Sequence, residues 1–393
     1  MWIFVGIGVH YAHKKMHQLQ NPELDSSLCK FMVNFVESQE FHVKTAYGVS
    51  EEKYCYSPDS KLYGLGQGIA WSGPGWLLSS DTIAKCKMKT CLGMEYKSPT
   101  TSLRVKKNQD KFVDDTGCGC NQKTISKTIM QQAQLNCKYH SKYVETTGGM
   151  IAADKSHFYH IDWEFKNGIP IPKEPHPDDA IKLQQIDGFD REFKKMQNTD
   201  EHKTLGCWVN PLGNNKKAFQ QMESFMRNWV NRMKHSQLPA KLIQKSYESE
   251  LKSQLRYCLP IYMFTKHQCD ELMKIVNPTL LHAHYINRNY PRSLLQAGDQ
   301  YGGINVTHIY DLMGMEKLKF LLMHLRRKDT TAKLLEIEFQ KIQLECGSET
   351  LFFNLEYEKF SHLVTESWSK HLWQYYDDRA IEMDVSLEIT QAK

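Results

Sequence analysis

The sequence predicts an α+β protein whose first part is built from small sheets and whose second part is helical. In the first part, short apolar runs alternate with glycine-rich turns such as Tyr63–Gly68 and Thr147–Gly149, as in strands joined by tight turns. From Ala218 onward, apolar residues recur three and four positions apart, which indicates amphipathic helices. The chain has no internal repeat and no low-complexity tract, so this change of pattern marks its main division.

Length and charge set broad limits on function. The chain has 393 residues, enough for two or three domains with a sizeable core. Its 50 lysines and arginines exceed its 45 acidic residues, which gives a net charge of +5. A mildly basic protein is compatible with a polyanionic partner, but this charge alone does not require one.

The cysteines and the first residues predict an intracellular protein, nuclear or cytoplasmic and not secreted. The 11 cysteines lack the even spacing of a disulfide framework, which indicates reduced thiols. The close pairs Cys86/Cys91 and Cys118/Cys120 have no second pair at zinc-finger spacing, so buried thiols are favoured over metal ligands. Met1–Val9 is apolar but much shorter than the roughly 20 residues of a membrane span. We expect a buried strand or helix piece there, or the ragged start of a truncated reading frame, and no membrane partner.

The helical part begins after a proline-rich connection, Ile169–Pro177. A helix is predicted over Gln268–Ala283, and a later one over Ile309–Leu325 follows the break at Tyr301–Gly303. The basic end of that later helix, Arg326–Lys328, suits a helix C-terminus, with a phosphate contact as the alternative. Two further helices are predicted from single apolar faces, namely Phe219, Met222, Met226, Trp229 and Met233, and then Tyr247, Leu251, Leu255 and Leu259.

Three pairs of neighbouring aspartates occur, and their contexts differ. The pair at 178 and 179 precedes a short apolar run and is expected to cap a helix. The pair at 377 and 378 continues a helical pattern and is followed by Arg379, which indicates a solvated helix face. Asp114 and Asp115 instead follow Phe112 and Val113 and precede Gly117, which predicts a strand end with a hairpin turn.

A hairpin turn at Asp114 and Asp115 would bring two like charges together. Ionising both is unfavourable unless a cation lies beside them. Hard carboxylate oxygens with few other protein ligands favour Mg²⁺, or Mn²⁺. The two acids are therefore candidate metal ligands and catalytic residues of a two-metal nucleotidyl-transfer site, in which one ion activates the attacking oxygen and the other stabilises the leaving pyrophosphate.

With these residues in place, the chain resembles reverse transcriptases of non-LTR, LINE-like retrotransposons. Phe112–Asp115 is similar to their metal-binding hairpin. Gly66, Gln67 and Gly68, with Ser72, resemble their Gln-Gly motif, whose glycines lie against template, primer and incoming nucleotide. Lys155, in the stretch Thr147–Ser156, occupies the position of a lysine that donates a proton to pyrophosphate.

The resemblance continues into the second part of the chain. Leu205 and Gly206, with Trp208, resemble the primer-grip hairpin, and Tyr301–Ile304 resembles the Gly-Gly-Leu segment that follows the thumb. The implied partners are an RNA template, a DNA primer and deoxynucleoside triphosphates, whereas the oligomeric state stays open. The implied domains are a partial right-hand palm with an incomplete ferredoxin-like sheet (1–204), a primer-grip-like hairpin (205–215), a helical thumb (216–300) and a helical C-terminal region (301–393).

Two departures from the family pattern affect the expected activity. The family has a further metal-binding aspartate in an Asp-x4-Asp motif upstream of Lys44–Ser50, but residues 1 to 24 contain no aspartate and Asp25 is followed five positions later by Lys30. The fingers that precede this strand in the family are missing too. With two acids for two divalent ions, we expect this chain, truncated at its N-terminus relative to the family, to polymerise poorly or not at all. Ser72-Gly-Pro74 also replaces the usual Ser-Pro.

Two alternatives stay open from the sequence. One is a non-catalytic nucleic-acid binder, a relic or domesticated piece of a retrotransposon whose basic thumb holds a duplex through phosphate contacts. The other is an unrelated α+β domain, in which Gly68, Asp115 and Lys155 would lie on different surfaces.

Overall fold

The computed structural model describes residues 72–112, 115–121, 128–145, 150–166, 169–173, 176–184 and 188–383, and short stretches at 34, 38, 40–42, 44–45 and 48–55. Several sequence predictions fall outside these ranges. The expected apolar segment Met1–Val9, the Gln-Gly motif at Gly66–Gly68, the first acid Asp114 and the turn Thr147–Gly149 all lie outside the described residues.

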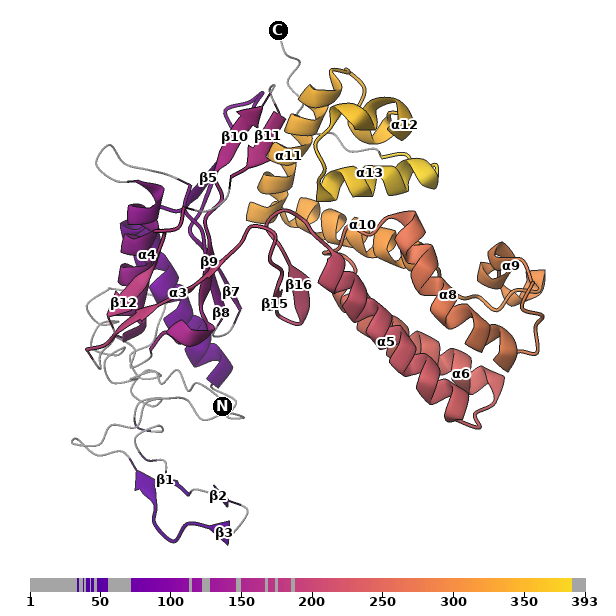
Figure 1. The fold of residues 1–393 in the computed structure, drawn as a ribbon, viewed down its shortest axis with the longest axis horizontal. Helices are drawn as coiled ribbons and strands as arrows, with labels where there is room; N and C mark the ends of the chain where they lie inside the picture. Colours follow the sequence, from indigo (N-terminus) through magenta and orange to yellow (C-terminus); the bar gives the residue numbers. More distant parts are fainter. Residues whose placement is uncertain are drawn as a thin grey trace. The chain divides into compact units, whose positions relative to one another are not determined.

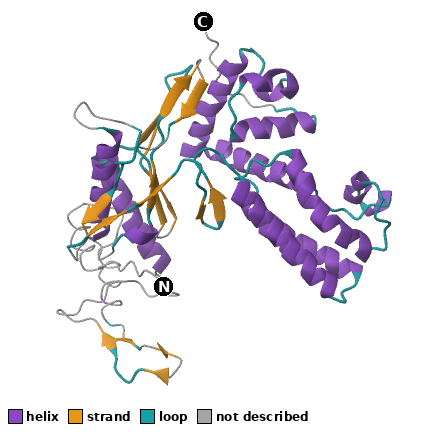
Figure 2. Ribbon diagram, in the orientation of Figure 1, coloured by secondary structure: helices purple, strands orange, loops and turns teal. Residues whose placement is uncertain are grey.

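Two compact units divide the chain. The first comprises residues 1–95 and 106–197, and the second comprises residues 96–105 and 198–393. The first unit contains most of the strands and two long helices, whereas the second is helical apart from two short hairpin segments (Figures 1 and 2). The protein is thus a mixed helix and sheet structure, compatible with the α+β class predicted from the sequence.

The described strands pair in twos. The pairs are β1–β4, β2–β3, β5–β6, β7–β8, β9–β14, β10–β11, β12–β13 and β15–β16, and of these β9–β14 is parallel. The bounds are β1 Glu40–Phe41, β2 Lys44–Thr45, β3 Gly48–Val49, β4 Tyr54–Cys55, β5 Met94–Lys97, β6 Arg104–Lys107, β7 Gln109–Phe112, β8 Asp115–Cys118, β9 His157–Tyr159, β10 Trp163–Lys166, β11 Ile169–Pro172, β12 Lys182–Gln184, β13 Asp190–Glu192, β14 Lys194–Met196, β15 His202–Thr204 and β16 Cys207–Val209.

Two helices of the first unit, α3 (Ser72–Thr90) and α4 (Ile129–Glu145), pack against each other. The buried positions of α4 are polar, including Gln132 and Asn136. The Gln132 amide donates to Asn136 Oδ1 at 2.9 Å, and Asn136 Nδ2 donates to the carbonyl of Leu92. Buried amides cost free energy unless they are hydrogen-bonded, so these contacts fix the side of α4 that faces the unit's interior.

The second unit is a bundle of helices around one apolar core. Its long helices are α5 (Lys216–His235), α8 (Lys266–Ala283), α10 (Ile309–Arg327), α11 (Thr330–Cys346) and α13 (Trp368–Asp378). The shorter ones are α6 Ala240–Ser246, a π-helix η2 at Tyr247–Leu251, α7 Lys252–Cys258, α9 Arg292–Gln296, α12 Tyr357–Phe360, and the 3₁₀ turns η3 Asp299–Tyr301, η4 Phe352–Asn354 and η5 Ser361–Leu363.

The predicted helix faces of this unit are confirmed. On α5, Met222, Met226 and Trp229 are each 0% exposed, and Met233 is buried with them. The second predicted row, Tyr247, Leu251, Leu255 and Leu259, is likewise buried. Full burial of such a side chain contributes about 1.5–3 kcal/mol. The amphipathic periodicity therefore reflects the main source of stability in this unit.

Two local predictions in the first unit are wrong. Asp178 and Asp179 do not begin a helix, because the residues that follow enter strand β12, which pairs with β13. Asp179 instead meets His160 Nδ1 at 2.6 Å. The proline-rich segment at 169 is also more than a connection, since its first four residues form β11. A strand can accept proline at an edge, where its missing N–H is not needed.

The predicted domain limits are only partly comparable with the two units. The change of unit falls between Gln197 and Asn198, close to the expected palm boundary at residue 204, and the expected thumb and C-terminal region share one unit. As for the membrane, within the described ranges we find no helix with the length and apolar character of a bilayer span.

Candidate functional site

The hairpin β7–β8 carries the candidate metal ligands. Its strands pair so that Phe112 lies opposite Asp115 and Gln109 lies opposite Cys118. The residues that join the two strands are therefore Val113 and Asp114, which lie outside the described residues. The sequence predicted a hairpin turn at Asp114 and Asp115, with Gly117 as a turn-forming residue. Gly117 instead lies within β8, opposite Asp110. The register instead starts strand β8 directly at the second acid.

Asp115 is exposed at the start of β8. Residues alternate between the faces of a strand, so Asp115 and Gly117 share one face, and Cys118 belongs to the other. Among the residues that the structure describes, Asp115 has no ion-pair partner, and no group of three or more metal-binding side chains occurs. Asp115 thus offers a hard oxygen donor of the type that Mg²⁺ prefers, and Asp114 lies outside this test.

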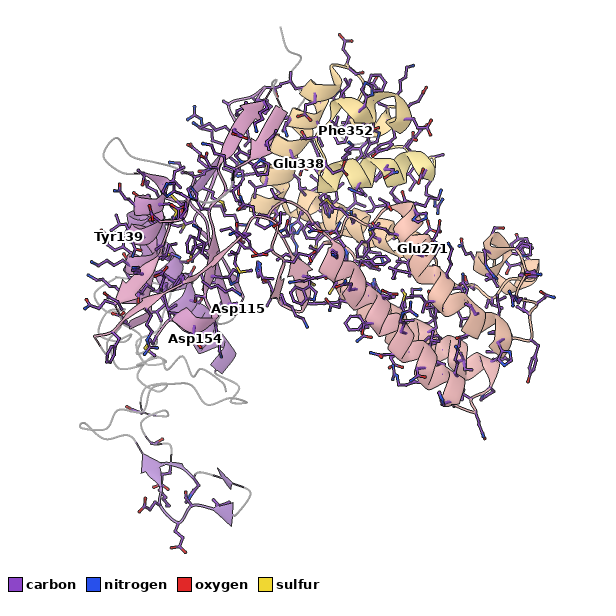
Figure 3. All side chains as sticks on the ribbon, viewed as in Figure 1. Asp115, Tyr139, Asp154, Glu271, Glu338 and Phe352 are labelled. Carbon is purple, nitrogen blue, oxygen red and sulfur yellow. The ribbon has the colours of Figure 1, made fainter. Side chains whose placement is uncertain are left out.

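The other predicted residues of the first unit have different settings. Ser72 is the first residue of α3, and Pro74 falls in the first turn, where the missing N–H of proline costs nothing. Lys155 ends a short 3₁₀ turn, η1 (Ala153–Lys155), and is exposed. The described contacts include none between Lys155 and Asp115. Figure 3 labels Asp115 and Asp154, the neighbour of Lys155, on the first unit.

The hairpin β15–β16 forms the predicted tight turn. Its two central residues, Leu205 and Gly206, have φ angles of 51° and 86°, the combination of a type I′ turn, which matches the twist of the paired strands. The Tyr257 hydroxyl donates to the Leu205 carbonyl at 2.9 Å, and Gln221 Nε2 donates to the Gly206 carbonyl at 3.0 Å. Side chains from helices α7 and α5 thus donate hydrogen bonds to both carbonyls of the turn and fix its position.

Buried groups next to the turn also fix this hairpin. The Cys207 thiol donates to Cys258 Sγ at 2.7 Å, and the Trp208 N–H donates to the Tyr262 hydroxyl at 3.1 Å. Burial raises the pKa of Cys207 to about 12 and also raises the pKa of Tyr262, so these groups stay neutral. The hairpin is therefore fixed to the helices of its own unit by these buried contacts.

Basic side chains of the helical unit are interspersed with acids and do not form a uniformly positive surface. A shallow depression between α5 and α8 includes Arg227, Lys234 and Lys274. Two of these pair with acids, since Arg227 contacts Glu223 and Lys274 contacts Glu271. Lys234 has no acidic partner within the described part of the chain. At the end of α10, Lys328 adopts a left-handed cap with φ 51°, in agreement with the predicted helix end at the basic cluster.

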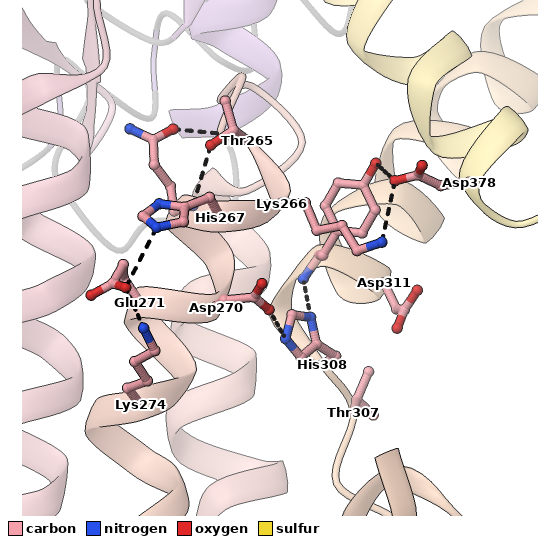
Figure 4. A network of polar contacts seen from close by, with 12 residues as sticks. Thr265, Lys266, His267, Asp270, Glu271, Lys274, Thr307, His308, Asp311 and Asp378 are labelled. Carbon is pink, nitrogen blue, oxygen red and sulfur yellow. Dashed lines mark hydrogen bonds and ion pairs between the residues drawn. The ribbon is translucent and has the colours of Figure 1, made fainter. Parts of the chain in front are cut away.

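A polar network that the sequence did not reveal joins the N-termini of α8 and α10 (Figure 4). His308 caps α10 by accepting from the Tyr310 N–H, and its Nε2 lies 3.0 Å from Asp270 Oδ1. The Tyr310 hydroxyl donates to Asp378 Oδ2 at 2.9 Å, and Lys266 lies 3.8 Å from the same oxygen. The second acid of the third aspartate pair, Asp378, thus ends helix α13 and contacts residues of α8 and α10.

Thr265 begins α8 with a capping box, in which its hydroxyl accepts from the Gln268 N–H and the Gln268 side chain accepts from the Thr265 N–H. A Thr-x-x-Gln pattern is visible in the sequence, so this cap could have been found. The contacts of His308 with Asp270 could not, because the two residues are far apart along the chain and follow no spacing rule.

Comparisons with known proteins add no assignment. The search against protein-family models gave no match to this chain. The search of curated proteins likewise found no relative.

Proposed function

We propose that this chain is the palm and thumb portion of an RNA-directed DNA polymerase related to those of LINE-like retrotransposons. The observation that carries the proposal is the register of β7–β8, with Phe112 opposite Asp115. An aromatic residue at the end of one strand, two connecting residues and an acid at the start of the next strand form the arrangement that the resemblance implies.

Three further observations support the proposal. Helix α3 begins at Ser72, four residues after the Gln-Gly motif. A type I′ hairpin at Leu205 and Gly206 directly precedes helix α5. The helical unit then carries exposed basic side chains, of which Arg232 and Lys234 lie in the last turn of α5. Each element occurs in the order that the resemblance requires.

In this proposal each residue has a chemical role. Asp114 and Asp115 would hold Mg²⁺ or Mn²⁺, which supplies charge stabilisation for nucleotidyl transfer when bound. Lys155 would donate a proton to the leaving pyrophosphate. Leu205 and Gly206 would present backbone to the primer end, and basic side chains of the thumb would contact phosphates of an RNA template and DNA primer.

Metal binding gives the most direct test. Titration with Mn²⁺, followed by electron paramagnetic resonance, is expected to show binding by the wild-type chain and loss of binding in Asp114→Asn and Asp115→Asn. Asp110→Asn is the matched control, because Asp110 lies on the same face of the same hairpin, opposite Gly117. Equal Mn²⁺ binding by all four proteins would remove the metal site.

Function is then separated from mere binding by two assays on the same proteins. Primer extension on an RNA template with Mg²⁺, abolished in the Asp115→Asn variant, would support a polymerase. We expect weak extension at most from this chain alone, since only two of the family's acids are present. Duplex binding that weakens steeply with salt, with no extension by any variant, would favour the non-catalytic binder. If the chain shows neither primer extension nor duplex binding, the hypothesis of an unrelated α+β domain is favoured.

A further inference from the structure

Lys87 is a buried cation beside an exposed thiol. Its side chain, on α3, is only 1% exposed, and Nζ donates to Cys118 Sγ at 2.8 Å. Among the described residues, no carboxylate pairs with this ammonium group. A lysine is rarely buried to this extent unless a negative charge accompanies it, because the desolvation of an unpaired ammonium is very costly. Cys118 is the group that the Lys87 side chain contacts.

Cys118 is also the most exposed of the thiols described in this part of the chain. It is exposed, whereas Cys86, Cys120 and Cys137 are half-buried and Cys91 is buried. Cys91 and Cys137 lie near Lys87 and Cys118. Burial raises the pKa of Cys91 and raises the pKa of Cys137 to about 12. These two remain protonated thiols of low reactivity. One sulfur of the group thus combines solvent access with contact to a cation.

We propose that Cys118 is a peroxide-sensitive modification site, in which a solvent-accessible thiol lies against the buried Lys87 side chain. Such an electropositive, exposed setting is typical of reactive cysteines. The thiolate sulfur attacks one oxygen of a hydroperoxide, the O–O bond breaks, and hydroxide or alkoxide leaves and takes a proton from water. Sulfur is oxidised by two electrons to sulfenic acid, and the peroxide is reduced by the same two.

The site does not depend on the proposed polymerase function. Oxidation adds an oxygen to the sulfur that accepts from Lys87, so the hydrogen bond of this buried side chain must change. The end of β8 is where this change acts, three residues after Asp115.

The test is the rate of sulfenic acid formation at each cysteine of the intact chain. The protein is treated with hydrogen peroxide and dimedone, and labelled peptides are quantified by mass spectrometry. Cys118 is expected to react about tenfold faster than Cys86, a half-exposed thiol on α3. Lys87→Met is expected to remove this advantage, and Lys89→Met, a change of an exposed lysine on the same helix, to keep it. Equal rates at Cys86 and Cys118 in the wild type would overturn the proposal.

A measurement on the wild type alone covers the case in which Lys87→Met fails to fold. The rate of alkylation by iodoacetamide is followed from pH 6 to pH 8.5. Cys118, whose sulfur accepts from Lys87, is expected to react faster than Cys86 at every pH of this range. A Cys118 rate no higher than the Cys86 rate across this range would contradict the proposal.

Discussion

Lys317 Nζ lies 5.6 Å from the centroid of the Trp368 ring, and the lysine side chain is 1% exposed. Nζ has no hydrogen-bond partner in the described part of the chain. Burial lowers the pKa of Lys317 to about 7, against small opposing effects of Cys269 and Glu366. A cation–π contact recovers only part of the desolvation of an ammonium group. The core of the helical unit therefore contains a lysine whose surroundings favour the neutral amine over the ammonium form.

The first prediction concerns this buried amine. The unfolded pKa of lysine is about 10.4, so between pH 7 and that value the unfolded chain binds more protons than the folded one. The free energy of unfolding should therefore rise with pH across this range, and the full penalty applies below pH 7. Lys317→Met should stabilise the protein at pH 7 by about 2 kcal/mol and flatten this rise. Urea denaturation at several pH values, followed by tryptophan fluorescence, measures both effects.

The control for Lys317 is Lys319→Met, two residues along the same helix. Lys319 is exposed and pairs with Glu316 at 2.8 Å, a surface contact that contributes little to stability. If both variants gave the same pH profile as the wild type, the buried amine would have no measurable effect on folding.

The second prediction concerns the turn of β15–β16. Leu205 has a positive φ, which costs about 1 kcal/mol for a side chain of this kind. Asparagine tolerates this conformation, so Leu205→Asn should raise the melting temperature. Gly206→Ala should lower it, because only the backbone conformation is unfavourable there; an added Cβ would meet the Tyr257 ring at an ordinary 3.6 Å. Opposite signs for the two variants in thermal denaturation are expected, and equal signs would speak against a type I′ turn.

The third prediction concerns Gly314, which lies in α10 against the Tyr375 ring. A Cβ at this position would come within 2.4 Å of the ring. Alanine is intrinsically better in a helix by about 1 kcal/mol, so Gly314→Ala would stabilise a helix without neighbours. We expect it to destabilise the protein by about 2 kcal/mol, since overpacking outweighs propensity. In a Tyr375→Leu background the loss should shrink by at least about 0.5 kcal/mol, and additive effects in the two backgrounds would exclude this contact.

The fourth prediction concerns His308. Burial lowers its pKa, although the carboxylates of Asp270 and Asp311 oppose this effect and Arg379 reinforces it. Because the folded-state pKa is below that of the unfolded chain, stability is present above the unfolded value and decreases as the pH falls through it. His308→Asn, which can still cap α10, should therefore lose less stability between pH 7 and pH 5 than the wild type.

Denaturation at pH 7 and pH 5 tests this prediction, with His267→Asn as the control. His267 is also on the α8 side of the network but has an 82% exposed side chain. A wild-type pH dependence retained in His308→Asn would place the sensitivity elsewhere.

The helical part of the fold was predictable because its signal is local. Every turn of α5 places an apolar residue at the same angle, so Met222, Met226 and Trp229 identify the buried face without tertiary information. The same local reasoning gives the wrong element for the residues after Asp179. A short apolar run fits a strand or a helix equally well, and here the backbone contact of Phe193 with the Ile181 carbonyl decides for the strand. That contact is not encoded in local spacing.

The candidate site was predictable only in part, for a related reason. The hairpin at Phe112 and Asp115 could be predicted from neighbouring residues. The structure differs in that Gly117 lies in strand β8 and not in the turn. The contact between Lys87 and Cys118 joins residues 31 positions apart, and neither residue type at its position suggests the other. Such pairs arise when a helix packs on a strand, so they become visible only after the fold is known.

The π-helix at Tyr247–Leu251 sets the rotational phase of the helix that follows. Residues spaced by four advance about 40° beyond a full turn in a regular α-helix, so a row such as Tyr247, Leu251, Leu255 and Leu259 would wind away from the core. The wider turn of the π-helix absorbs one residue and corrects this drift. Deleting a single residue here would rotate α7 by about 100°. Cys258 would then turn away from Cys207, and the hairpin would lose its contacts with Cys258 and Tyr257.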